Sequence, residues 1–127
     1  MNEWVNKAQQ DYLVAIHLSS QENASLWYDT ICFHCQQAVE KYLKAFLKMN
    51  NQIIPKIHDL VALMNLCKQF DNEIESMLLQ LAHLNQYSVT FRYPDGVASK
   101  ENANQAVKDM KTFLTLIEKK LEKFGKL

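Results

Sequence analysis

The residue of this chain whose type most clearly suggests chemistry is Arg92, because it is the only arginine beside thirteen lysines. A guanidinium carries a planar fork of N–H donors that matches a phosphate or a carboxylate. Arg92 could therefore hold a phosphate while the neighbouring Tyr93 stacks on a base. It could also form an internal ion pair with Glu40 or Asp59, which would tie its own segment to the rest of the fold.

A second candidate for chemistry is His58, which Asp59 follows directly. A carboxylate beside an imidazole can hold the ring in one tautomer, as in general-base pairs. With His58 as the general base and Arg92 stabilising the negative charge of a phosphorane, the protein would be a metal-independent ribonuclease. The alternative is that Asp59 caps the start of a helix and that His58 is a partly buried histidine.

Three lysines, Lys41, Lys44 and Lys48, form a stripe on one side of a predicted helix, joined by Gln37. Such a stripe could follow a phosphate backbone. A solvated helix face explains the same pattern.

An aromatic residue of the same predicted helix, Phe33, lies away from its apolar stripe and close to Gln36 and Glu40. It indicates a second buried surface, either a dimer interface or the docking place of the segment that carries Arg92. A single exposed phenylalanine is also normal in globular proteins.

The three cysteines, Cys32, Cys35 and Cys67, are expected to be small apolar core residues in a reducing compartment. Two thiolates at the spacing of Cys32 and Cys35 do not complete a tetrahedral metal site. We therefore expect no metal and no cofactor.

These residues must be positioned by helices, because apolar side chains recur at steps of three and four along most of the chain. The pattern predicts helices at about 3–20, 26–49, 58–70, 72–84 and 100–123. Ser25 is the expected N-cap of the second helix, and Asn72 with Glu75 resembles a capping box for the fourth. Alternating residues from 87 to 99 predict an irregular, extended loop before the last helix.

The composition favours the same architecture. Two glycines and two prolines are too few for the many tight turns of a sandwich or barrel. Residues 1–127 are therefore expected to form a single all-α domain, an antiparallel, up-and-down bundle of four to five helices. Fourteen acidic residues balance fourteen basic ones, so bulk charge gives no argument for nucleic acid. No apolar run reaches membrane-spanning length and no signal pattern begins the chain, so we expect a cytoplasmic protein.

Three stretches in this order resemble the HEPN family, the higher eukaryotes and prokaryotes nucleotide-binding domain. They are FHCQQAVEKYLKA at 33–45, IPKIHDL at 54–60 and RYPD at 92–95. The opening residues Trp4, Ala8, Asp11, Tyr12 and Ala15 also fit the family pattern.

The resemblance implies a helical bundle that commonly forms a homodimer and often pairs with a minimal nucleotidyltransferase in toxin–antitoxin-like modules. Many members are ribonucleases with an Arg-x4–6-His motif. No histidine follows Arg92, which argues against an enzyme and places this chain outside the branch with that motif.

We therefore expect a nucleotide- or RNA-binding module first, a purely structural dimeric interaction protein second, and a ribonuclease using His58 and Arg92 third. The residues expected to bind nucleotide or RNA are Arg92, Tyr93, Asp95, Lys41, Lys44, Gln37 and His58.

Overall fold

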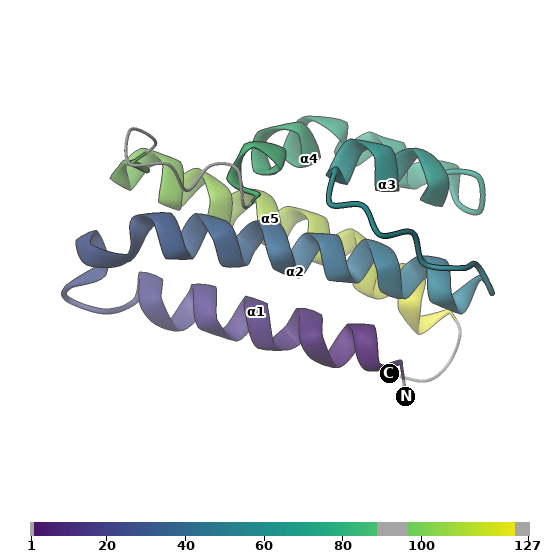
Figure 1. Cartoon of the computed structure of the whole chain (residues 1–127), viewed down its shortest axis with the longest axis horizontal. Coiled ribbons are helices and arrows are strands. Elements are labelled where there is room, and N and C mark those ends of the chain that lie inside the picture. The colour runs from purple at the N-terminus through teal and green to yellow at the C-terminus, as the bar shows by residue number, and fades with distance from the viewer. Residues whose placement is uncertain (1, 89–96, 124–127) are drawn as a thin grey trace.

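The computed structural model describes residues 2–88 and 97–123, and within these ranges the chain forms helices and no strands (Figure 1). The prediction of an all-α helical bundle is confirmed. The five α-helices are α1 (Glu3–Ser19), α2 (Tyr28–Met49), α3 (Leu60–Cys67), α4 (Leu78–Leu84) and α5 (Lys100–Glu122). Short 3₁₀ turns precede α2 and flank α4, at Ala24–Trp27, Asn72–Met77 and Asn85–Tyr87.

The long helices α1, α2 and α5 form the body of the bundle, and α3 and α4 lie along the side of α2 opposite α1 (Figure 1). Helices α1 and α2 are antiparallel, since the Asn2 side chain at the start of α1 donates to the Ala45 carbonyl near the end of α2, at 3.0 Å. Helix α5 runs in the same direction as α2 (Figure 1). At their common starting end, the Asp29 carboxylate accepts a 2.6 Å hydrogen bond from the Ala98 backbone N–H.

The α2 helix ends in a Schellman motif that turns the chain back along the bundle. Asn51 has a positive φ of 60°, a conformation that asparagine tolerates better than most residues. The Asn51 N–H donates to the Lys48 carbonyl and the Gln52 N–H to the Leu47 carbonyl, each at 3.0 Å. The following segment, 52–59, has no regular secondary structure and returns along α2 to the start of α3 (Figure 1).

The start of α3 is held by Asp59. Its carboxylate accepts from the backbone N–H groups of Val61 and Ala62, at 2.9 and 3.0 Å. Asn85 braces the same point, because its side chain accepts from the Leu60 N–H and donates to the Asp59 carboxylate. The predicted cap at Asp59 is therefore confirmed, and it holds the backbone next to His58 in place.

The predicted caps of two other helices are wrong. Ser25 lies in the 3₁₀ turn before α2, and Trp27 occupies the N-cap position of α2 without a side-chain hydrogen bond. At the fourth predicted helix, Asp71 rather than Asn72 is the cap, accepting from the Glu73 N–H at 3.1 Å. The chain makes its capping box at α5 instead, between Ser99 and Asn102.

All three cysteines are buried in the hydrophobic core and none is in a disulfide. Burial raises the pKa of the Cys32 and Cys67 thiols to about 12, and it raises the pKa of the Cys35 thiol as well. The interpretation of these cysteines as core residues is confirmed. Within the described part of the chain, no helix is both long and apolar enough to cross a membrane.

Candidate functional site

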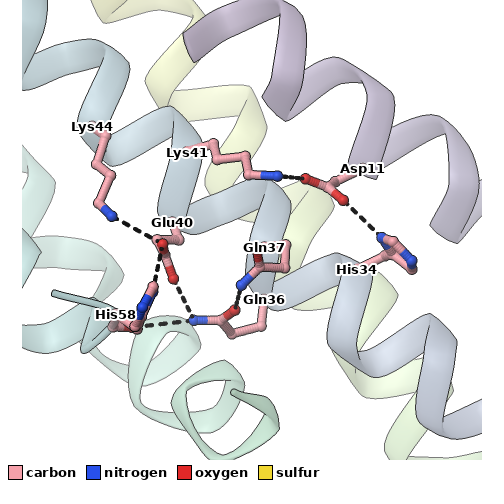
Figure 2. A network of polar contacts seen from close by, with 8 residues as sticks. All are labelled: Asp11, His34, Gln36, Gln37, Glu40, Lys41, Lys44 and His58. Atoms are coloured by element: carbon pink, nitrogen blue, oxygen red, sulfur yellow. Dashed lines mark hydrogen bonds and ion pairs between the residues drawn. The ribbon is translucent and has the colours of Figure 1, made fainter. Parts of the chain in front are cut away.

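A buried carboxylate, Glu40, is the centre of a polar network on α2 (Figure 2). Gln36, Glu40 and Lys44 are spaced four residues apart, so they lie on one face of the helix. The Glu40 carboxylate accepts from the Gln36 amide at 3.2 Å and from the Lys44 ammonium at 3.0 Å. Its third partner is His58, whose Nδ1 lies 3.0 Å from Glu40 Oε2. One helix thus supplies three of the four side chains, and the segment before α3 supplies the fourth.

The Glu40–Lys44 ion pair is almost completely shielded from solvent, with side-chain exposures of 4% and 6%. Removing two charges from water costs several kcal/mol per ion, and their attraction and hydrogen bonds must offset this cost. Replacing such a pair by apolar residues is often neutral or stabilising. The pair is therefore better explained by the side chains it positions than by a gain in stability.

His58 is the exposed member of the network, with 64% of its side chain accessible. Glu40 engages Nδ1, and the Gln36 amide donates to the His58 backbone carbonyl at 3.2 Å. Both the ring and its backbone are therefore held, and Nε2 is the nitrogen left for a ligand. Of the two alternatives for Asp59, the structure shows the helix cap and not the pairing with the His58 ring. The carboxylate that holds the ring is Glu40, from α2.

Beside His58 the surface has a hollow of about 420 Å³. It is lined by Trp4, Lys44, Ile54, Pro55, Lys56 and His58. The Lys44 ammonium lies 5.5 Å from the centre of the Trp4 ring, within the range of a cation–π interaction. The hollow therefore brings together an aromatic ring, two lysines and an oriented imidazole, drawn from α1, α2 and the 52–59 segment.

A second arm of the polar network joins α1 to α2 through Asp11 (Figure 2). The Asp11 carboxylate accepts from the Lys41 ammonium at 2.5 Å and lies 2.7 Å from His34 Nδ1. Burial raises the pKa of Asp11, but the hydrogen bonds with His34 and Lys41 outweigh burial, and the net pKa lies below its ordinary value. Gln37 donates to the Gln36 side chain at 2.7 Å, next to Glu40.

The predicted lysine stripe is divided among different environments. Lys41 is paired with Asp11, Lys44 is buried against Glu40, and only Lys48 is exposed. Two of the three positive charges are thus compensated within the chain, which leaves little of the stripe to follow a phosphate backbone. The exposed lysine beside the hollow is Lys56, which the sequence argument did not single out.

The residues predicted for an interface also occupy different environments. Phe33 is half-buried, and its ring meets His34 edge to face with the centroids 5.4 Å apart. Gln36 and Glu40 are buried within the chain, where they bond to each other and to His58, so their side chains are not offered to another molecule.

Of the residues predicted to bind nucleotide or RNA, the structure gathers Lys44, Gln37 and His58 around Glu40 and puts Lys41 on the Asp11 arm. Arg92, Tyr93 and Asp95 lie outside the described residues. Sequence reasoning missed Trp4 and Lys56 as site residues. Their signal was present, since both lie in stretches that carry the family resemblance.

Comparison with known protein families gives a match over most of the chain. The sequence model of the HEPN domain matches residues 1–120, which includes every residue of the polar network and of the hollow. No curated protein and no solved structure matches the chain.

Proposed function

Because this chain belongs to the HEPN domain family, whose domain is a nucleotide- or RNA-related module, we propose that it binds a nucleotide or single-stranded RNA in the hollow beside His58. The observation that carries the proposal is the meeting of Trp4, Lys56 and the Glu40-held His58 around one hollow of about 420 Å³. Small-ligand sites commonly combine an apolar surface with a few well-placed polar groups.

Each of these side chains has a distinct role in the proposed complex. The half-buried Trp4 ring stacks on a base, an interaction that tolerates any base because every base has a π-face. The exposed Lys56 ammonium neutralises a phosphate, and His58 Nε2 makes a hydrogen bond to the ligand. The Lys44 ammonium is paired with Glu40, so it contributes less to phosphate binding. It also lies against the Trp4 ring and helps to position that ring.

Titration of the protein with a fluorescently labelled mononucleotide and a labelled oligoribonucleotide tests this proposal. Trp4→Leu is expected to weaken binding by about tenfold through lost stacking, and Lys56→Ala to weaken it and reduce its salt dependence. Lys48→Ala is the matched control, because Lys48 is an exposed lysine of α2 outside the hollow. Unchanged affinity in both Trp4→Leu and Lys56→Ala would exclude the hollow as the binding site.

The same titration addresses Arg92. We propose that its guanidinium, together with Tyr93 and Asp95, contributes to the phosphate and base contacts, because a planar donor fork suits a phosphate. Equal affinity of wild type and Arg92→Ala would remove Arg92 from the site.

A second candidate function is metal-independent RNA cleavage with His58 as base and Arg92 stabilising the transition state. The observation in its favour is the 3.0 Å contact between the buried Glu40 and the exposed His58, the arrangement of an oriented general base. Purified protein would be incubated with RNA in EDTA. Cleavage that is lost in His58→Ala and reduced in Glu40→Gln supports this candidate, and cleavage that persists in His58→Ala refutes the assignment.

Family membership also supports a proposal about partners. We propose a cytoplasmic homodimer that pairs with a minimal nucleotidyltransferase in a toxin–antitoxin-like module. A neighbouring reading frame for such an enzyme and co-purification with it would support the pairing. Light scattering of wild type and Phe33→Glu tests the dimer, and a dimer without nucleotide binding would favour the purely structural alternative.

A further inference from the structure

A second pocket, separate from the hollow beside His58, lies between the C-terminal end of α4 and the side of α5. Its volume is about 230 Å³, which suits a small group better than a whole nucleotide. Its polar lining comes from His83, Gln86 and Tyr87 on one side and from Asn102, Gln105 and Asp109 on α5.

The base of this pocket is a buried carboxylate with one incompletely satisfied oxygen. Asp109 is 4% exposed, and its Oδ1 accepts a 2.8 Å hydrogen bond from the Gln105 amide. Its Oδ2 is buried and accepts no hydrogen bond from the described residues. His83 Nδ1 lies 3.4 Å from Oδ2, a contact between ionisable groups that lacks hydrogen-bond geometry. Buried carboxylate oxygens normally accept a hydrogen bond, so Asp109 Oδ2 is a position where a donor group of a ligand would be stabilised.

The amide groups around Asp109 are arranged so that their oxygens remain available. Gln105 uses its N–H on Asp109, and Gln86 uses its N–H on the His83 backbone carbonyl at 2.9 Å. Within the described part of the chain, the side-chain oxygens of Gln86 and Gln105 accept no hydrogen bond. The Asn102 oxygen is already taken by the N–H and hydroxyl of Ser99. Among the polar groups that line the pocket, the Asp109 carboxylate and the side-chain oxygens of Gln86 and Gln105 are hydrogen-bond acceptors.

A ligand for this pocket must therefore donate hydrogen bonds, and a positive charge would complement Asp109. An anion such as phosphate would meet the carboxylate at close range and be repelled. His83 covers Oδ2, but its side chain is 48% exposed and it lies near the end of the seven-residue α4. The imidazole can therefore turn outward and admit a donor group to Asp109.

We propose that this pocket binds a planar N–H donor of the guanidinium type, with Asp109 as its partner and the Gln86 and Gln105 oxygens as flanking acceptors. Two kinds of small molecule carry this donor fork, a free guanidino compound and a guanine base, whose ring nitrogen and amino group point in one direction. The pocket is distinct from the proposed nucleotide site, so either proposal can fail without the other.

Titration of the full chain with methylguanidine, guanosine and inosine, followed by NMR and calorimetry, tests the proposal. Asp109→Asn keeps the shape and removes the charge, and it is expected to weaken binding at least about tenfold. His83→Ala uncovers Oδ2 and is expected to tighten binding severalfold. Glu122→Gln is the control, because it removes an exposed carboxylate at the other end of α5.

Preference for guanosine over inosine, which lacks the amino group, would identify the guanine edge, and binding of methylguanidine alone would identify a guanidino compound. Perturbed NMR signals of His83 and Gln105 in the wild-type protein test the location even if Asp109→Asn unfolds. Absence of binding to both wild type and His83→Ala overturns the proposal. Binding only in Arg92→Ala would also overturn it, since the chain would then fill the pocket with its own guanidinium.

Discussion

At the scale of single residues, carboxylate side chains organise the polar contacts between the elements. Glu40, which holds His58, precedes it by 18 residues in the sequence, whereas the sequence suggested the adjacent Asp59 as one possible partner. Residues adjacent in sequence need not pair through their side chains. As the N-cap of α3, the Asp59 carboxylate accepts from the α3 backbone and points away from the His58 ring. The four-residue spacing of Gln36, Glu40 and Lys44 shows that these side chains share one helix face, but it does not show that His58 meets that face.

The Asp11 carboxylate gives a prediction for the pH dependence of stability. Its folded pKa is depressed below the ordinary value of 3.8, so its contribution is present above about pH 4 and is lost as the pH falls through the folded pKa. Asp11→Asn is expected to lower the free energy of unfolding by about 1–3 kcal/mol at pH 7. The difference from wild type should shrink below pH 4.

Urea denaturation at pH 7, 5 and 3 measures this difference. Glu22→Gln, which removes an exposed carboxylate of the first loop, serves as the control and should change stability little at any of these pH values. A deficit of Asp11→Asn that stays constant from pH 7 to pH 3 would contradict the argument.

At the scale of elements, the hydrophobic period predicted the long helices well and the short ones less well. Helix α1 was expected at 3–20 and spans Glu3–Ser19, and α5 was expected at 100–123 and spans Lys100–Glu122. The third helix was expected at 58–70, but α3 spans only Leu60–Cys67. The fourth is a 3₁₀ turn followed by the short α4. A segment of only a few turns contains too few repeats of the hydrophobic pattern to distinguish a 3₁₀ helix from an α-helix.

The caps of α3 and α5 should differ in their functional consequences. Asp59→Ala and Ser99→Ala should each destabilise the protein by about 1 kcal/mol through the lost cap. Asp59 also receives the Asn85 side chain and directly follows His58, so only Asp59→Ala should weaken nucleotide binding in the hollow. Urea denaturation and the nucleotide titration measure the two effects. Equal binding losses in the two variants would indicate that general stability, and not the position of His58, controls the site.

At the scale of the whole molecule, one hydrophobic core unites all five helices, and the three cysteines report on its integrity. They come from α2 and α3 and are fully buried. Their location in the core could be predicted from the sequence, because free cysteines are commonly buried. The course of α5 parallel to α2 could not, since nothing in the hydrophobic pattern states how the 52–59 segment returns the chain.

The thiols should therefore be unreactive in the native protein. Burial raises the pKa of Cys32 and Cys67 to about 12, so at pH 8 almost no thiolate forms, and reagents cannot reach the sulfur atoms. Labelling with a thiol reagent should follow the rate or extent of global unfolding for all three cysteines together. Lys48→Cys provides an exposed thiol that should react at once. Rapid labelling of a single native cysteine would show that its part of the core opens separately.

The position of Trp4 in the first turn of α1 has a consequence for how the hollow responds to its ligand. Helix ends fray, and here Asn2 holds the end by accepting from the Trp4 N–H at 2.9 Å and donating to α2. Occupancy of the hollow should suppress fraying and slow amide hydrogen exchange in the opening turns of α1. Because such coupling is reciprocal, a substitution that removes the Asn2 hydrogen bonds should lower the affinity of a ligand in the hollow, although the ligand does not contact Asn2.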